Sequence, residues 1–162
     1  MPIVATADLC DQGGDALQVL PPGLLNLGGL AAFNGRVTTL RVHEDNALVR
    51  TVLSSAGDGR VLVIDGGGSV RTALVGGKLG QLAQDNGWSG IVVWGAVRDA
   101  VELAVARVGI RALATCPRPP LKTGAGERDV PVVLGGITIT PGMWLAADAD
   151  GVVVAAHPPE TP

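Results

Sequence analysis

Two short segments of this 162-residue chain carry residue types that could do chemistry. The first is Gly76-Gly77-Lys78-Leu79, which stands where a helix is expected to begin. Backbone N–H groups at a helix N-terminus point outward and attract anions, and glycine lets a ligand approach the backbone closely. This segment could therefore bind a carboxylate. A glycine hinge between a strand and a helix would have the same pattern.

The second segment is Arg98-Asp99, which follows the apolar run Gly90–Trp94. A guanidinium is always charged and can grip a carboxylate or keto oxygen through two parallel hydrogen bonds. The neighbouring aspartate could hold a hard divalent cation that keeps several waters, as Mg²⁺ prefers. The alternative is a surface ion pair near the start of a helix.

Two apolar runs must position these segments. Val61–Ile64 and Gly90–Trp94 contain no polar residue apart from the flanking glycine, which is typical of strands buried on both faces. An alternating strand is expected over 36–42, and helices over 47–53, 79–86 and 99–104. Strands that alternate with helices in this way predict parallel βαβ units, whose ligands bind at the carboxyl ends of the strands. Both candidate segments are expected at that edge.

The last third of the chain shows no alternation of strands with helices. A polar loop over 115–129 precedes three strand-like pieces, at 130–134, 137–140 and 152–156, which are separated by turns rich in glycine and proline. Such turns favour antiparallel pairing. We therefore expect an α/β fold with a mixed sheet, parallel in the middle and antiparallel late. One domain would span residues 1–162, with 1–27 as an N-terminal wrap and 158–162 as a frayed tail.

The composition excludes several classes of function. A net charge of −3 argues against non-specific electrostatic binding to nucleic acid or to anionic lipid. The two cysteines are far apart and the two histidines are too few for a conventional zinc site. No apolar stretch reaches membrane-spanning length, and the first eight residues predict no secretory signal. A cytoplasmic protein is the expectation.

A glycine-rich turn, Asp65-Gly66-Gly67-Gly68-Ser69, follows the first buried strand. It is superficially similar to the turns of nucleotide-binding and methyl-transferring enzymes. The spacing does not match a dinucleotide-binding fingerprint, and the segment after Ser69 is too short for the helix that such a fingerprint opens. A tight turn at which two backbones meet is the simpler interpretation.

In order along the chain, several pieces together resemble the regulator of ribonuclease activity A family, which includes the 4-hydroxy-4-methyl-2-oxoglutarate aldolases. The pieces are Gly28-Gly29 with Phe33 and Gly35, then Glu44–Leu48, Val63–Val75, Trp94–Asp99 and Lys122–Glu127. Each piece is weak alone, but the ordered set covers nearly the whole chain.

The resemblance implies a compact swivelling β/β/α domain that assembles as a ring-shaped homotrimer, with sites between subunits. It also implies cleavage of 4-hydroxy-4-methyl-2-oxoglutarate to two pyruvates, oxaloacetate decarboxylation as a side activity, and a divalent cofactor such as Mg²⁺ or Mn²⁺. Carried over by position, the amides of Gly76, Gly77, Lys78 and Leu79 would hold the carboxylate of a small 2-oxo acid. Arg98 would contact substrate oxygen as the catalytic residue, and Asp99 would ligate the metal. No general base can be assigned.

One position departs from the resemblance. Active members of that family carry an acid where this chain has Gly77, and the neighbouring Lys78 adds positive charge near the expected cation. We therefore expect weak turnover, and expect Gly77→Asp to raise it. The alternative function is a protein-binding regulator that inhibits an RNA-degrading endonuclease without contacting RNA. A methyltransferase, suggested only by the Asp65 turn, is a third possibility.

Overall fold

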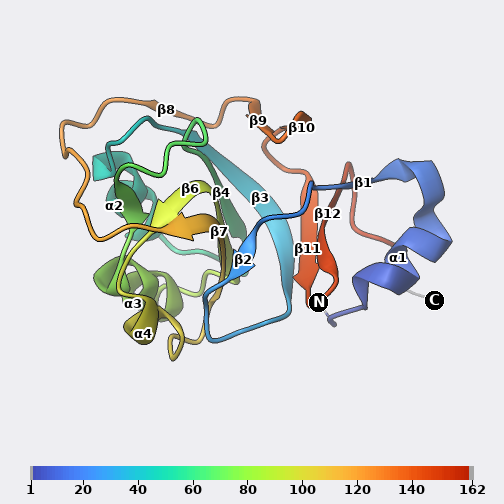
Figure 1. Ribbon diagram of the computed structural model, residues 1–162. Helices are drawn as coiled ribbons and strands as arrows, with labels where there is room; N and C mark the ends of the chain where they lie inside the picture. The colour runs from blue at the N-terminus through green and yellow to red at the C-terminus, as the bar shows by residue number, and fades with distance from the viewer. Residues whose placement is uncertain (1, 161–162) are drawn as a thin grey trace.

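A computed structural model describes residues 2–160 (Figure 1). The helices are α1 (Thr6–Gly13), α2 (Ala47–Leu53), α3 (Gly77–Asp85) and α4 (Ala100–Leu103), with a 3-10 turn at Gly14–Ala16. The strands are β1 (Leu17–Val19), β2 (Leu25–Asn26), β3 (Phe33–Arg41), β4 (Val61–Asp65), β5 (Ala73–Val75), β6 (Gly90–Val97), β7 (Gly109–Thr115), β8 (Glu127–Arg128), β9 (Val132–Leu134), β10 (Ile137–Ile139), β11 (Trp144–Asp148) and β12 (Gly151–Ala155). None of the helices within 2–160 is long and apolar enough to cross a membrane.

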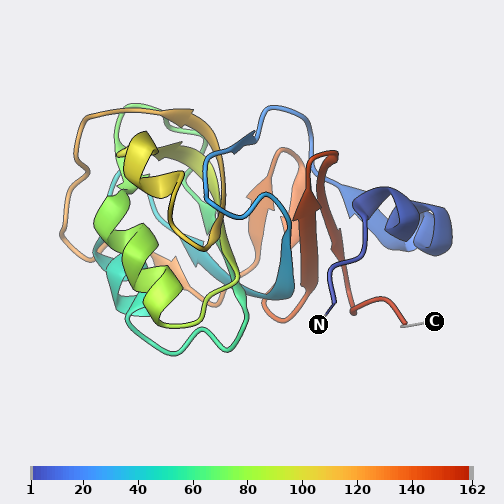
Figure 2. The same cartoon turned by 90° about the horizontal axis from the view of Figure 1, so that it is seen from below.

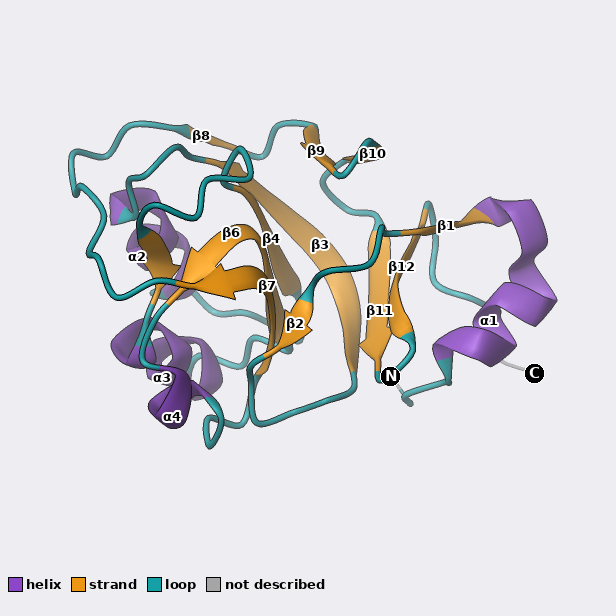
Figure 3. Ribbon diagram, in the orientation of Figure 1, coloured by secondary structure: helices purple, strands orange, loops and turns teal. Residues whose placement is uncertain are grey.

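Most strands join one mixed sheet in the order β1-β12-β11-β3-β4-β6-β7-β2 (Figure 3). The central pairs β3–β4, β4–β6 and β6–β7 are parallel, whereas β1, β12, β11 and β3 pair antiparallel. The short strand β5 adds a further parallel pair beside β6. The predicted mixed sheet, with parallel strands in the middle and antiparallel strands late, is confirmed.

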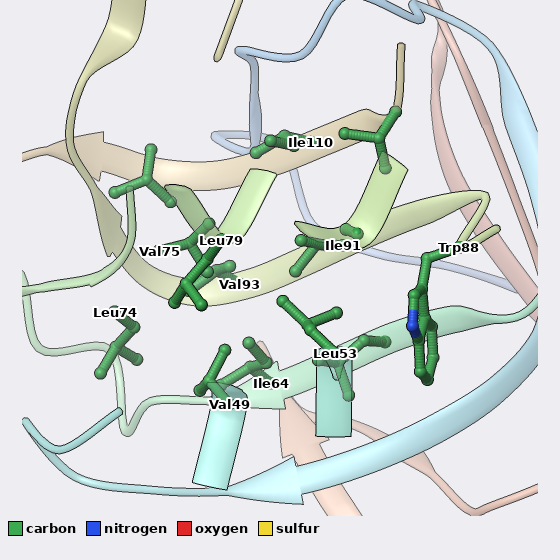
Figure 4. Close-up of a cluster of buried hydrophobic side chains, with 14 of the residues drawn as sticks. Val49, Leu53, Ile64, Leu74, Val75, Leu79, Trp88, Ile91, Val93 and Ile110 are labelled. Atoms are coloured by element: carbon green, nitrogen blue, oxygen red, sulfur yellow. The ribbon is translucent and has the colours of Figure 1, made fainter. Parts of the chain in front are cut away.

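Strand β4 shows why its sequence is apolar throughout. Leu62 and Ile64 point into a cluster beneath helices α2, α3 and α4, while Val61 and Val63 point into a second cluster on the other face of the sheet. All four side chains are fully buried. Figure 2 shows the three helices gathered on one side of the central strands, and Figure 4 shows the side chains that fill the space between. Because period-two alternation places neighbours on opposite faces, a strand covered on both sides carries no polar position.

Helix α1 packs against the antiparallel part of the sheet. Helix α1 lies against β11 and β12, where Leu9 joins Trp144 in a small third cluster. The backbone N–H of Thr6 donates to Asp148 at 2.7 Å, and the Thr6 hydroxyl donates to the same carboxylate at 2.6 Å. Burial opposes ionisation of Asp148, but these hydrogen bonds, together with those from the backbone N–H groups of Asp150 and Gly151, outweigh it and lower its pKa.

The sequence patterns missed some elements. Helix α1 and strand β11 were not expected, because residues 1–27 lack a clear period and 144–148 lie between two turn signals. The helix expected over 99–104 is shorter, at Ala100–Leu103. Of the expected frayed tail, 158–160 form no helix or strand, and 161–162 lie outside the described residues.

Candidate functional site

Helix α3 begins directly after strand β5, at the edge of the sheet where the sequence places the first candidate segment. Gly76 is the N-cap residue of the helix and has an extended conformation. Because it is a glycine, no side chain caps the helix. A Cβ atom at this position would lie 2.8 Å from Asp99 Oδ2 and 3.3 Å from Arg98 Cγ. Glycine at position 76 therefore lets the second candidate segment pack directly against the start of α3.

Asp99 joins the two segments by a hydrogen bond. The backbone N–H of Gly77 donates to Asp99 Oδ2 at 2.8 Å. Asp99 itself is exposed and precedes α4 in the left-handed conformation, with φ 60°. Aspartate tolerates this conformation better than most residues because its short polar side chain can form local hydrogen bonds. The carboxylate thus occupies the place of an anion at the N-terminus of α3.

Arg98 follows β6, which is the parallel neighbour of β5. Its backbone N–H donates to the carbonyl of Val75 at 2.9 Å, which holds the ends of the two strands together. Its Nη1 donates a long hydrogen bond of 3.4 Å to the carbonyl of Pro117, in the polar loop. The side chain is half-buried. The guanidinium therefore keeps donors available beside Gly76.

The other two residues of the first segment differ in how they can act. Lys78 is exposed, whereas the Leu79 side chain is buried in the cluster beneath the helices (Figure 4). Leu79 can therefore contact a ligand only through its backbone. The first-turn N–H groups of a helix have no partner within the helix, so those of Lys78 and Leu79 remain donors. The Gly77 amide, in contrast, already donates to Asp99.

A second carboxylate belongs to the same place, and the sequence patterns did not single it out. Glu102 lies in the first turn of α4, and its Oε2 would be 1.8 Å from a Cβ atom at position 77. It lines a shallow hollow of about 330 Å³ between α3 and α4 together with Gly77, Lys78, Gln81, Val105 and Ala106. Its spacing of three residues from Asp99 is the signal that could have found it, because such residues share one side of a helical turn.

The Asp65–Ser69 turn is accounted for by its own contacts. Asp65 Oδ1 accepts a hydrogen bond from the backbone N–H of Gly67 at 2.8 Å, and Gly67 and Gly68 both have positive φ. A Cβ atom at Gly66 would lie 2.8 Å from the carbonyl oxygen of Trp94. The turn is therefore a place where two backbones meet, as its simpler interpretation holds.

The family described as RraA-like (Aldolase/RraA) matches residues 6–154. The chain belongs to this family. A relative from Laribacter hongkongensis (strain HLHK9), named "Putative 4-hydroxy-4-methyl-2-oxoglutarate aldolase", is 56% identical over 153 residues, which cover 94% of this chain and 96% of the relative.

Two solved structures share the fold closely. The RNA-processing inhibitor RraA from Thermus thermophilis has a TM-score of 0.94 and 49% identity, covering 99% of this chain and 96% of that chain. A protein from Geobacillus kaustophilus HTA426, described as an S-adenosylmethionine: 2-dimethylmenaquinone methyltransferase, has a TM-score of 0.93 and 44% identity, covering 96% of both chains. The resemblance to the regulator of ribonuclease activity A family, expected from the sequence, is thereby confirmed.

The donors of this RraA-like site suit one kind of cation. Within residues 2–160 no group of three or more histidine, cysteine, aspartate or glutamate side chains gathers as a metal site. Asp99 and Glu102 nevertheless both contact Gly77, one through its N–H and one over its Cα. Mg²⁺ and similar hard cations bind through one or two carboxylates and keep several waters, so the donor set fits them. It does not fit zinc, which prefers nitrogen and sulfur ligands.

Proposed function

We propose that this RraA-like protein is a carbon–carbon lyase that acts on small 2-oxo acids with the help of a divalent cation such as Mg²⁺ or Mn²⁺. Its reactions would be the cleavage of 4-hydroxy-4-methyl-2-oxoglutarate to two pyruvates and the decarboxylation of oxaloacetate to pyruvate and carbon dioxide. The observation that carries the proposal is the contact between the two candidate segments, in which the Gly77 N–H donates to Asp99 beside Arg98.

Each residue of the site would bind a different part of the substrate or the cation. The free first-turn N–H groups of Lys78 and Leu79 would donate hydrogen bonds to the carboxylate of the substrate, helped by the positive end of the α3 dipole. The Arg98 guanidinium would contact the keto oxygen or the second carboxylate, and so fix the orientation of the bond that breaks. Asp99 would hold the cation. No residue of this site is assigned as a general base.

Charge explains why the site would need a cation. Asp99 and Glu102 place two negative charges around Gly77, and a 2-oxo diacid brings two more. Arg98 and Lys78 offset only part of this charge, and like charges at such short range repel strongly. When bound, a divalent cation supplies the remaining positive charge and stabilises the charge that develops on the keto oxygen.

The proposal includes a homotrimer. Beside the site, Val101 of α4 and Val105, two residues after α4, are 85% and 78% exposed, and Leu121 of the polar loop is 65% exposed. A second copy of the chain that covers these side chains would remove apolar area from water and would also shield the exposed site. Light scattering of the purified protein should then give about three times the 16.3 kDa of one chain.

The test is to follow pyruvate release from oxaloacetate with Mg²⁺ or Mn²⁺. The protein should exceed the rate of the metal alone, Arg98→Ala and Asp99→Ala should lose that excess, and Arg107→Ala, an exposed arginine elsewhere, should keep it. The same variants are then compared on 4-hydroxy-4-methyl-2-oxoglutarate. A rate equal to that of the metal alone for the unchanged protein would refute the lyase.

A second candidate function is favoured by the Thermus structure, which is described as an RNA-processing inhibitor. In this alternative the protein binds an RNA-degrading endonuclease and inhibits it without contacting RNA. Addition of the purified protein to such an endonuclease should slow RNA cleavage, and Arg98→Ala should slow it equally well, since the lyase site would play no part.

A further inference from the structure

Arg111 places a positive charge inside the protein, on the face of the sheet opposite the helices. It lies in β7 next to Val92 of β6, which belongs to the second hydrophobic cluster, and it is only 5% exposed. Its Nη2 donates to two carbonyl oxygens, those of Ala31 at 3.1 Å and Asp148 at 2.5 Å. These bonds hold the guanidinium between β7 and the end of β11.

The contacts of Arg111 leave much of its guanidinium without a partner. Nε is fully buried and unpaired, and no hydrogen bond within residues 2–160 uses Nη1. No carboxylate in that part of the chain forms an ion pair with Arg111. Burial lowers its pKa, and the attraction of the Asp148 carboxylate offsets only part of this effect. Because a buried charge without a partner costs free energy, an anion beside Arg111 would be stabilised.

A hollow of about 300 Å³ beside Arg111 has room for such an anion. Residues 19–24, Arg111 and residues 149–152 line it, so it lies between the end of β1 with the segment that follows it and the turn that joins β11 to β12. Arg111 is the only cationic side chain in this lining, and Asp150, an exposed residue of the turn, is the only acidic one. Every other lining residue has an apolar side chain or is a glycine.

This lining favours an anion that is itself partly apolar. Leu20 and Val152 are buried residues of the second cluster and form part of the wall, together with Pro21 and Leu24. Contact with these side chains would remove apolar area of the ligand from water. Asp150 would repel a second negative charge, so a ligand with one charge fits better than a dianion.

We infer that Arg111 and this hollow form a binding site for a small monocarboxylate with an apolar body. The carboxylate would accept hydrogen bonds from Nη1, and a charge-assisted bond of this kind is stronger than one between neutral groups. The apolar body would lie against Pro21, Leu24 and Val152. The site does not depend on the proposed lyase, because α3 and α4 lie on the other face of the sheet.

The experiment titrates isovalerate into the isotopically labelled protein and follows the backbone amide signals by NMR. The signals of Gly23 and Gly151 should shift and saturate. Isovaleramide has the same shape without the charge and should shift them little. Saturable shifts confined to the amides of Lys78 and Leu79 would place the carboxylate at α3 and overturn the inference. The absence of any saturable shift would overturn it as well.

Variants at the rim change the charge of the hollow without touching the buried arginine. Val19 is exposed and lines the hollow. Val19→Asp should weaken isovalerate binding about fivefold, the effect of two unit charges a few ångströms apart in water, whereas Val19→Asn should change it little. Asp150→Asn should strengthen binding for the same reason. Asp85→Asn, which removes a negative charge at the end of α3, should leave it unchanged.

Arg111→Met removes the charge and should abolish the saturable shifts of Gly23 and Gly151. The same change leaves the carbonyls of Ala31 and Asp148 without their donor, so its melting temperature is measured first. If Arg111→Met does not fold, the two Val19 variants decide the question, and equal affinity in both would overturn the inference. If Arg111 only braces the end of β11, the unchanged protein would bind isovalerate no better than isovaleramide, which would also overturn it.

Discussion

The Asp45 carboxylate accepts a hydrogen bond from the backbone N–H of Thr123, 78 residues further along the chain, at 2.7 Å. The Thr123 hydroxyl donates to the same oxygen, and the other oxygen accepts from the N–H groups of Ala47 and Gly124 at 3.1 and 3.3 Å. Asp45 is only 2% exposed. One buried carboxylate therefore joins the start of α2 to the polar loop whose Pro117 carbonyl contacts Arg98.

Asp45→Asn should destabilise the protein by about 2–3 kcal/mol, because an amide NH₂ group would face N–H donors that now bond to a charged acceptor. The free energy of unfolding in urea measures this. Asp58→Asn, an exposed aspartate with positive φ that asparagine also tolerates, is the control and should change little. Equal stability of the two variants would show that the loop is held elsewhere.

The same group predicts an acid-dependent loss of stability. Burial opposes ionisation of Asp45, but the hydrogen bonds from Thr123, Ala47 and Gly124 outweigh it and lower its pKa below the usual 3.8. A carboxylate with a lowered pKa stabilises the folded state above its unfolded pKa, and this contribution disappears as the pH falls through the folded pKa. The free energy of unfolding should therefore drop below about pH 4, and less steeply in Asp45→Asn.

Gly109→Ala should destabilise the sheet by about 1–3 kcal/mol through overpacking. The ring of Phe33 lies between the first residues of β6 and β7, and a Cβ atom at Gly109 would lie 2.0 Å from its Cδ1. Since Phe33 is 2% exposed, the ring has no open space into which to move. Phe33→Leu in the same chain should restore part of the loss, and urea denaturation of the two single variants and the double variant measures it.

Asp99→Asn and Asp99→Ala should separate the conformational role of Asp99 from its charge. Asparagine tolerates positive φ and keeps an acceptor for the Gly77 N–H, so the melting temperature should stay near that of the unchanged protein. Alanine at this position should cost about 1–2 kcal/mol. Both variants should lose Mn²⁺ binding. Retained binding in Asp99→Asn would show that its charge is not needed.

The central strands β3, β4 and β6 and the helices α2 and α3 could be predicted from the sequence because their patterns are local, whereas α1, β7 and β11 could not. An unbroken apolar run is enough to indicate a strand covered on both faces, and the segment after each run must then lie at the same edge of the sheet. That logic placed Gly76 and Arg98 together, and the structure has them in contact. It could not reveal that the Gly77 N–H donates to Asp99, since no local pattern records a hydrogen bond between the starts of two helices 22 residues apart.

Glu102 was missed for a different reason. It lies in a helix of four residues, too short to show a period, and its carboxylate lies over a residue that has no side chain. A glycine in the sequence marks where a side chain is missing, but not which neighbour fills the space. The three-residue spacing from Asp99 could place Glu102 on the same side of the helix, but only the backbone positions of α3 and α4 show that it lies over Gly77.

Gly77→Asp tests the placement of the cation, and the structure shows which side chain must move to admit the aspartate. An aspartate at position 77 would collide with Glu102, whose flexible and exposed side chain would swing away. The substitution therefore adds a carboxylate beside Asp99 and should raise pyruvate release from oxaloacetate with Mg²⁺ or Mn²⁺. Gly77→Ala displaces Glu102 in the same way but adds no carboxylate, so it is the control and should not raise the rate. An unchanged rate in Gly77→Asp would count against the placement of the cation at Asp99.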